Sequence, residues 1–255
     1  MIPALVLTCL AAIALPFVAY PFLLWLRATI APDPVVGGEV TPSVDLVIAA
    51  HDEAASIGAR IENALALDYP ADRLTIWIGS DGSTDDTVAI ARRYEARGVR
   101  VLDLPRGGKA AALRAMVDAS AEGGGEILAF SDANSDWPAD ALRELVAPFA
   151  DDRVGGVAGD QRYVENAGDE ALGERGYWSF DRALKRWQTR AGNAISSTGA
   201  IHAVRRRCFE APPADATDDF MISTGVIAAG ERLVFAEDAI AWEPTAEPVG
   251  GEFRR

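Results

Sequence analysis

Cysteine and histidine are scarce in this chain of 255 residues, with two of each. Cys9 and Cys208 lie far apart, which predicts neither a disulfide framework nor a cysteine-based metal site. His51 and His202 are too few for a histidine-rich zinc site. Long basic runs are also missing, and 38 acidic against 24 basic residues give a net charge of −14. Because nucleic-acid binding depends on clustered Lys and Arg, we expect no nucleic-acid partner.

Charged side chains are absent from residues 1–26, a stretch longer than the roughly 20 residues that cross a bilayer. Membrane helices tolerate prolines such as Pro16 and Pro21. A signal peptide would show a basic n-region and a shorter apolar core, so a retained transmembrane helix over residues 1–27 is favoured over a signal peptide or a buried hairpin. Arg27 follows with no Lys or Arg before it, which predicts one pass through the inner or plasma membrane and a cytoplasmic domain.

The remaining chain reads as a Pro- and Gly-rich linker at 28–42 and one α/β domain at 43–255. Apolar runs predict strands near 44–50, 74–78, 99–102, 126–130, 154–159, 201–205 and 233–235. Helical spacing predicts helices near 56–67, 85–97, 109–121, 138 onward, 170–190 and 217–230. Strands that alternate with helices predict βαβ units with right-handed crossovers, and therefore a parallel sheet.

Polar, carboxylate-bearing loops follow three of the predicted strands. Because the carboxyl ends of parallel strands meet at one edge of a sheet, we expect Asp52, Glu53, Asp81, Asp132 and Asn134 to share a cleft. Asp132 and Asn134 stand two apart on a non-helical segment, and their oxygens suit a hard cation such as Mg²⁺ or Mn²⁺. The alternative is that Asp132 forms a turn and Asn134 caps a helix.

Two further patterns leave alternatives open. The run Gly107-Gly108-Lys109 at a helix start can offer backbone N–H groups and an ammonium to a diphosphate, although P-loop spacing is absent. Aromatic residues at helical spacing around Trp178 and Trp187 predict either core packing or a wall that binds sugar rings.

Six segments of the chain together resemble the membrane-anchored family 2 glycosyltransferases, the group with a GT-A fold that includes cellulose, chitin and hyaluronan synthases. The matching segments are Ala49–Glu53, Ser80–Asp85, Arg106–Lys109, Ser131–Asn134, Ser197–Ala200 and Thr217–Phe220. They occur in the order of the family. The resemblance implies a GT-A, Rossmann-like α/β fold with a mostly parallel central sheet flanked by helices.

The resemblance also implies roles for individual residues. The donor would be bound by His51, Glu53, Asp81, Lys109 and Asp132. Glu53 and Asp81 would contact the base and ribose, and Lys109 the diphosphate. Asp132 and Asn134 match the DxD metal motif with Asn in its last place, which keeps a carbonyl oxygen and removes one negative charge.

The acceptor side of the resemblance follows from two later motifs. Gly199, Ala200 and Asp218 would lie at the acceptor. Asp219 matches the general base of the TED motif. Asp218 competes with it for this assignment, as a helix cap or a supporting partner of the base. Alternatively, both residues only cap the helix.

These roles together imply an inverting, metal-dependent transferase that moves a sugar from a nucleotide-diphosphate donor to an acceptor. We expect the donor to be a UDP-sugar. We expect the acceptor to be a glycan or a lipid-linked molecule in polysaccharide or envelope glycan synthesis. A polyprenyl-phosphate glycosyltransferase and a non-catalytic nucleotide-binding membrane subunit are the alternatives. Processive members carry a Gln-x-x-Arg-Trp motif after this region. The printed sequence stops at Arg255 before any such motif, which leaves truncation of the domain open.

Overall fold

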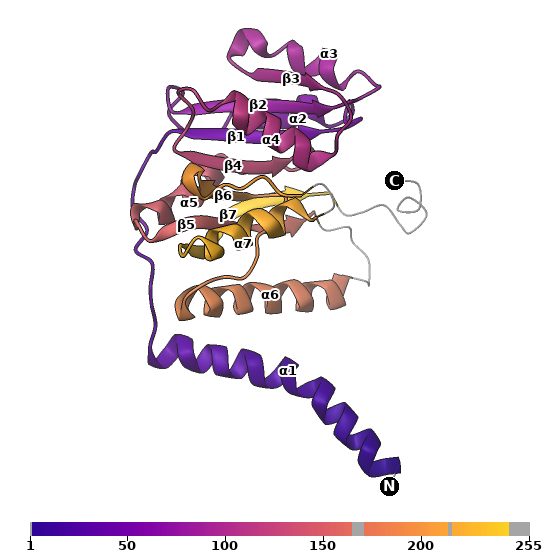
Figure 1. Cartoon of the computed structure of the whole chain (residues 1–255), viewed down its shortest axis with the longest axis vertical. Coiled ribbons are helices and arrows are strands. Elements are labelled where there is room, and N and C mark those ends of the chain that lie inside the picture. Colours follow the sequence, from indigo (N-terminus) through magenta and orange to yellow (C-terminus); the bar gives the residue numbers. More distant parts are fainter. Residues whose placement is uncertain (1, 165–170, 214–215, 245–255) are drawn as a thin grey trace.

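The computed structural model describes the backbone of residues 2–164, 171–213 and 216–244. Within these residues, one seven-stranded sheet runs in the order β3-β2-β1-β4-β6-β5-β7. The strands are β1 (Val44–Ala50), β2 (Leu74–Asp81), β3 (Arg100–Leu104), β4 (Ile127–Asp132), β5 (Val154–Tyr163), β6 (His202–Arg205) and β7 (Arg232–Glu243). The helices are α1 (Ile2–Ile30), α2 (Ile57–Leu65), α3 (Thr87–Arg92), α4 (Lys109–Ala119), α5 (Ala141–Val146), α6 (Ala171–Ala191) and α7 (Asp218–Ala228). Figure 1 shows the strands stacked from β3 at one end towards β5 and β7 at the other.

The prediction of a mostly parallel sheet is confirmed. Strands β3, β2, β1 and β4 are mutually parallel, as βαβ units require. Strand β6 is the exception, because it pairs antiparallel with both β4 and β5, whereas β7 returns parallel to β5. The prediction of a short last strand at 233–235 was wrong. Strand β7 has twelve residues, and it continues through a register shift opposite Ala158–Asp160 to reach Glu243.

Both faces of the sheet are buried, which explains why the inner strands are continuous apolar runs. Successive residues of β1 point to opposite faces, so Leu46 and Ile48 pack on one side and Val47 on the other. Helices α2 and α5 contribute to the first core and α4 and α7 to the second. The site loops therefore stand on a rigid, doubly covered scaffold.

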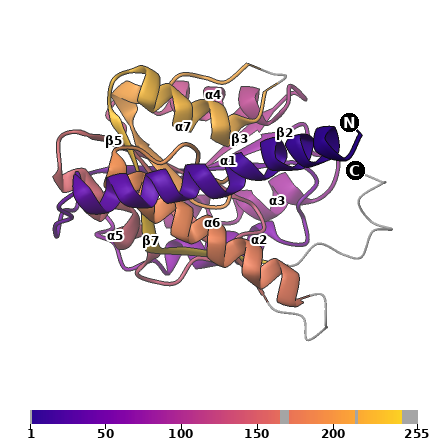
Figure 2. The same ribbon diagram turned by 90° about the horizontal axis from the view of Figure 1, so that it is seen from below.

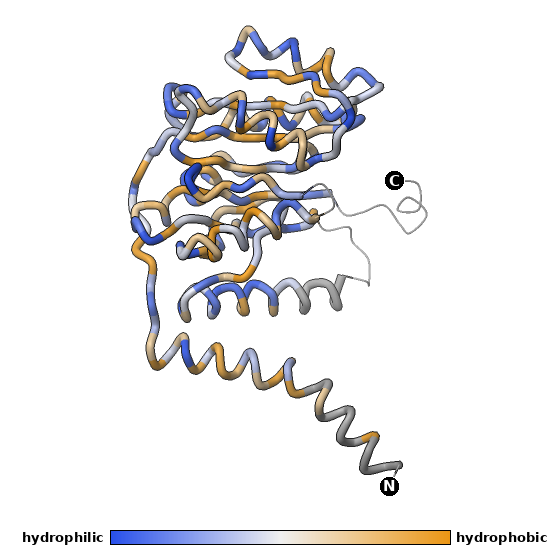
Figure 3. Tube along the Cα trace, viewed as in Figure 1, coloured by the Kyte–Doolittle hydropathy of each residue, from blue (hydrophilic) through white to orange (hydrophobic). Residues whose placement is uncertain are grey.

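Helix α1 packs against α6, beyond the β5–β7 end of the sheet (Figures 1 and 2). The linker after α1 is tied to the domain by Asp33, whose carboxylate accepts from Arg153 at 2.9 Å and pairs with Arg232 at 3.3 Å. Figure 3 shows α1 as mostly hydrophobic along its described length. Its large exposed side chains include Leu15, Phe17, Val18, Phe22, Leu23, Trp25 and Ile30.

Among the residues that the structure describes, no helix combines the length and apolarity needed to cross a bilayer. The predicted transmembrane helix at 1–27 is therefore not supported.

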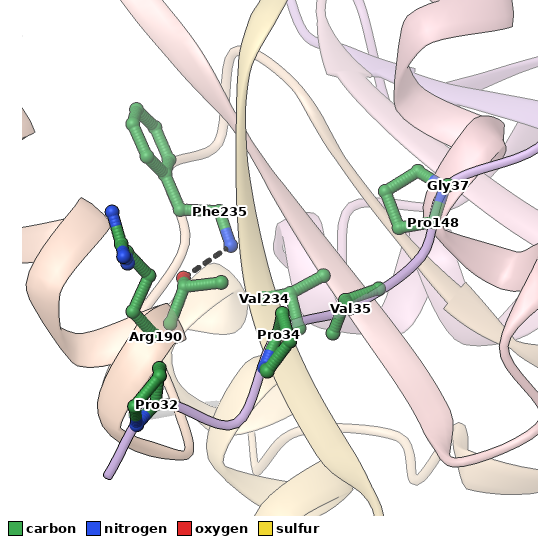
Figure 4. A pocket seen from close by; sticks show the side chains of 9 residues that line it. Pro32, Pro34, Val35, Gly37, Pro148, Arg190, Val234 and Phe235 are labelled. Carbon is green, nitrogen blue, oxygen red and sulfur yellow. Dashed lines mark hydrogen bonds between the residues drawn. The ribbon is translucent and has the colours of Figure 1, made fainter. Parts of the chain in front are cut away.

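A hollow of about 390 Å³ lies between the linker, α6 and β7 (Figure 4). Its lining is mainly apolar, from Pro32, Pro34 and Val35 to Phe235, with the charged side chain of Arg190 at one side. The backbone N–H of Phe235 donates to Thr189 Oγ1 at 2.8 Å across it. This hollow holds none of the acidic residues singled out in the sequence.

Candidate functional site

A second hollow, of about 420 Å³, opens at the carboxyl ends of β1, β2 and β4. It is lined by Ala49, Ala50, His51, Glu53, Asp81, Arg106, Lys109, Asp132, Ala133, Asn134 and Glu243. Every residue that the sequence assigned to the donor or the metal is in this lining. Parallel strand ends bring these residues together from segments up to about 80 positions apart.

The loops after β1 and β2 brace each other at one side of the cleft. His51 Nδ1 lies 2.8 Å from the Asp81 carbonyl oxygen. Asp52 adopts a left-handed backbone conformation with φ of 53°, and its carboxylate accepts from the Thr84 N–H at 2.7 Å. The Glu53 N–H donates to Thr87 Oγ1 at 2.8 Å. These contacts hold His51 and the Glu53 side chain at the rim.

Asp81 supports the loop that carries Lys109. Its side chain is 5% exposed, and it accepts from the N–H groups of Gly107 at 2.7 Å and Gly108 at 3.0 Å. Arg106 adds a charged contact at 2.7 Å. The carboxylate therefore already has three donors from within the chain. Sequence reasoning placed Asp81 at the nucleotide and did not foresee this bracing.

Lys109 lies at the centre of the cleft and joins two carboxylates. Its Nζ is 2.7 Å from Asp132 Oδ1 and 3.1 Å from Asp218 Oδ2. Burial alone would lower the pKa of Lys109, but the charges of Asp132 and Asp218 outweigh it and raise that pKa above its usual range. The Lys109 ammonium is thus fully charged at neutral pH, and it connects the end of β4 to the start of α7.

The oxygen donors at this edge suit a divalent cation such as Mg²⁺ or Mn²⁺. Asp132 Oδ1 already holds a cationic group, and Asn134 lines the same cleft with its amide exposed. Among the described residues, no cluster of three His, Cys, Asp or Glu side chains could enclose a metal. A cation bound here would therefore take most ligands from water and phosphate, as Mg²⁺ and Mn²⁺ do at nucleotide sites.

Glu243 also lines the cleft, and sequence reasoning missed it. Its Oε1 accepts from Ser135 Oγ at 2.9 Å and its Oε2 from Gln161 Nε2 at 2.6 Å. Burial raises the pKa of Glu243, and the neighbouring charge of Asp132 adds to the effect. Because the last strand was predicted to end at 235, this carboxylate was placed beyond the sheet. The apolar run Ala239–Trp242 directly before Glu243 was the available signal in the sequence.

The predicted acceptor turn lies directly against the metal motif. A Cβ atom built on Gly199 would stand 2.8 Å from Asp132 Oδ2, so only glycine fits there without displacement. Ala200 is fully buried, and its carbonyl accepts from Trp137 Nε1 at 3.0 Å, so its side chain lies outside the cleft. The Thr198 carbonyl lies 2.8 Å from His202 Nδ1.

Asp219 lies on the first turn of α7, next to the Asp218 that pairs with Lys109. Its Oδ1 accepts from the N–H of Phe220 at 2.7 Å, and its carbonyl accepts from Ser197 Oγ at 3.1 Å. Asp219 is half-buried and does not line the cleft itself. Of the two carboxylates, Asp218 faces the charged centre in this structure.

A buried guanidinium underlies the loop after β4. Arg60 Nε donates to Ser131 Oγ at 3.2 Å, its Nη1 donates to Asn63 Oδ1 at 2.6 Å, and its guanidinium covers the Trp137 ring at 5.0 Å. Asn63 in turn bonds both the N–H and the carbonyl of Trp137. Burial lowers the pKa of Arg60 to about 10, against the charges of Asp136 and Asp132. An arginine on a predicted amphipathic helix gave no sign of this role.

The fold of the protein resembles that of solved glycosyltransferases. The fold matches a mannosyltransferase from Pyrobaculum calidifontis, solved with GDP-Man and Mn²⁺, with a TM-score of 0.75 and 25% identity over 96% of this chain and 70% of that one. It also matches Staphylococcus aureus TarS, solved with UDP-GlcNAc, with a TM-score of 0.61 and 14% identity over 80% of this chain and 59% of that one. The fold is therefore GT-A-like.

Residues 45–211 match the sequence pattern of glycosyl transferase family 2. The chain belongs to this family. A β-monoglucosyldiacylglycerol synthase of Synechocystis sp. is 36% identical over 46% of this chain and 25% of its own length. An N-acetylglucosaminyltransferase of Rhizobium sp. is 24% identical over 90% of this chain and 55% of its own length. The chain thus spans between about a quarter and about half of the length of these relatives.

Proposed function

We propose that the protein is an inverting, metal-dependent glycosyltransferase that uses a nucleoside-diphosphate sugar. The observation that carries this proposal is the convergence of Asp132, Asn134 and Lys109 on one cleft at the carboxyl edge of the sheet. A positive ammonium and cation-binding oxygens together meet the needs of a diphosphate. The adjoining turn at Gly199 and helix α7 supply a neighbouring place for the acceptor.

The transfer is a single displacement. The acceptor hydroxyl oxygen bonds to the anomeric carbon, the bond from that carbon to the β-phosphate oxygen breaks, and the diphosphate leaves with the bonding electron pair. Lys109 offsets the negative charge that grows on the leaving group. A divalent cation held by Asp132 and Asn134 would add electrostatic stabilisation of the same charge.

Asp219 accepts the acceptor proton in this proposal, as the base of an inverting glycosidase accepts a proton from water. Asp218 holds Lys109 and therefore orients the donor side. The base must lie within hydrogen-bond reach of the acceptor oxygen, directly or through one water. Asp219 directly follows Asp218, the residue that pairs with Lys109, on the first turn of α7.

A UDP-linked sugar is the donor we propose, and a glycan the first acceptor. The test is turnover of a panel of UDP- and GDP-sugars with Mn²⁺ or Mg²⁺, with the anomeric configuration of the product read by NMR. Inverted products that require the metal and are lost in Asp132→Ala support the proposal. Release of free sugar that survives Asp219→Asn and excess chelator would count against catalysis in this cleft. Nucleotide binding without any turnover would favour a non-catalytic nucleotide-binding subunit.

A lipid acceptor at a membrane is the second candidate. The exposed apolar side chains of α1, such as Phe17 and Leu23, favour it, as do relatives named as β-monoglucosyldiacylglycerol synthases. In this case we propose that α1 holds a cytoplasmic domain at the inner or plasma membrane. Flotation of the full chain with phospholipid vesicles, and loss of flotation in a Phe17→Asp, Leu23→Asp variant, would support it. Transfer to diacylglycerol or polyprenyl phosphate then identifies the lipid.

A further inference from the structure

Lys109 already pairs with the Asp132 carboxylate, to which a divalent cation would bind in the proposed function. Its Nζ lies 2.7 Å from Asp132 Oδ1, which is within charge-assisted hydrogen-bond distance. The other oxygen, Oδ2, faces the backbone of Gly199 so closely that an added methyl there would stand 2.8 Å away. One oxygen of the Asp132 carboxylate is thus taken by the ammonium, and the other is crowded by the acceptor turn.

The charges in this cluster oppose a second cation. Asp132 and Asp218 carry two negative charges, and the Lys109 ammonium between them cancels one. A divalent cation that approached Asp132 with Lys109 in place would meet a like charge at contact distance. The Lys109 and Asp132 side chains are 38% and 31% exposed, so solvent screens this repulsion only in part.

A nucleoside diphosphate changes this balance because it brings several anionic oxygens. These oxygens give the ammonium a new partner and supply ligands to the metal at the same time. Lys109 starts the helix α4 and has a long flexible side chain, so it can move from one carboxylate to a phosphate without a backbone change.

We propose that Lys109 is the resident counter-ion of the metal site, and that metal and nucleoside diphosphate enter together by moving Lys109 off Asp132. The inference rests on the proposed function and adds an order to its binding steps. Metal alone binds weakly, because it must displace the ammonium. When Lys109 moves to the phosphates, its contact with Asp218 is also lost. Donor binding is therefore coupled to helix α7, which carries Asp218 and Asp219.

The experiment measures Mn²⁺ alone by isothermal titration, in the wild type and in Lys109→Gln. We expect Lys109→Gln to bind Mn²⁺ about tenfold more tightly than the wild type, a difference of about 1.4 kcal/mol. With UDP or GDP present, the same variant should bind the Mn²⁺–nucleotide pair about tenfold less tightly, because the phosphates lose their ammonium partner. Circular dichroism on heating checks that the variant is folded.

Arg106→Gln is the matched control. It removes one positive charge from the same cleft, but the charged contact of Arg106 is with Asp81 at 2.7 Å, whereas Asp132 pairs with Lys109. If Lys109 competes directly with Mn²⁺ for Asp132, this control should keep a Mn²⁺ affinity within about threefold of wild type. In free energy, a change of about threefold is less than half of a change of about tenfold.

If both variants bind Mn²⁺ more tightly by the same factor, the effect comes from the lower net positive charge of the cleft and the proposal is overturned. Unchanged Mn²⁺ affinity in Lys109→Gln with intact Mn²⁺–UDP binding overturns it as well, while the proposed function stands. Failure of every variant to bind UDP or GDP with Mn²⁺ overturns both.

Discussion

Gly199→Ala tests the contact between the acceptor turn and the metal motif. The added Cβ would lie 2.8 Å from Asp132 Oδ2, 3.2 Å from Oδ1 and 3.4 Å from Cγ. Non-bonded heavy atoms prefer separations of about 3.5–4.0 Å, so the carboxylate must move by roughly 0.5–1 Å. The part that moves is the end of a side chain, which yields more cheaply than backbone. We therefore expect a small loss of unfolding free energy, about 1 kcal/mol.

Donor binding should suffer much more than stability in Gly199→Ala. The displaced carboxylate leaves its place beside Asn134, where the two side chains would hold the metal. We expect the Kd of the Mn²⁺–UDP pair to rise about tenfold or more, which is at least about 1.4 kcal/mol. Isothermal titration measures the Kd, and thermal unfolding should show a Tm lower by about 2–4 °C.

Gly225→Ala is the control for Gly199→Ala. Gly225 lies inside α7, and its Cβ would meet nothing within 4 Å. Alanine should therefore stabilise this helix by about 0.5–1 kcal/mol and leave the Kd unchanged. If Gly199→Ala retains the wild-type Kd within about twofold, about 0.4 kcal/mol, the turn does not constrain Asp132 and the reasoning is refuted.

Four further variants test the rest of the site. Asp81→Asn should lower the unfolding free energy by about 2 kcal/mol, because it weakens charge-assisted bonds to the glycine amides; chemical denaturation with an unchanged midpoint would contradict this. Glu243 has a pKa raised above 4.5 by burial, so its stabilising contribution is present below that pH and is lost as pH rises through the raised pKa. Glu243→Gln should therefore gain stability relative to wild type as pH rises above 4.5, and a difference that stays constant with pH would argue against a buried acid. Asp219→Asn should keep donor affinity and lose transfer by about 10²–10⁴-fold, whereas Asp218→Asn should retain measurable transfer; equal losses would remove the basis for naming Asp219 as the base.

The first half of the fold could be predicted from the sequence because each element there has a local cause. Strand β1 was placed at the observed bounds, Val44–Ala50, since a fully buried parallel strand is a continuous apolar run. The placement of Asp81, Asp132 and Asn134 in one cleft followed from a topological rule about parallel strand ends. Neither inference required knowledge of a side-chain contact.

The second half was less predictable because its contacts are long-range. Strand β7 was cut short at 235 because Glu237 and Asp238 interrupt the apolar pattern at a register shift. Its continuation to Glu243 depends on pairing with β5, some 80 positions away. The antiparallel direction of β6 likewise depends on its two neighbours in the sheet rather than on its own four residues.

Polar partners inside the site were also beyond sequence reasoning. Asp81 was expected to face the nucleotide, yet its oxygens accept from Arg106 and the glycine pair. Spacing alone does not reveal which of several donors a buried carboxylate satisfies. The same holds for Arg60, whose position over the Trp137 ring follows from tertiary packing.

Equilibrium binding of nucleotide sugars is the most direct test of the cleft around Asp132. UDP- and GDP-sugars would be titrated into wild type and Asp132→Ala, each with and without Mn²⁺. We expect saturable binding to wild type that requires Mn²⁺ and is lost in Asp132→Ala. Binding that is indifferent to both the metal and the substitution, or no binding of any nucleotide sugar, would contradict the assignment of this cleft to a glycosyl donor.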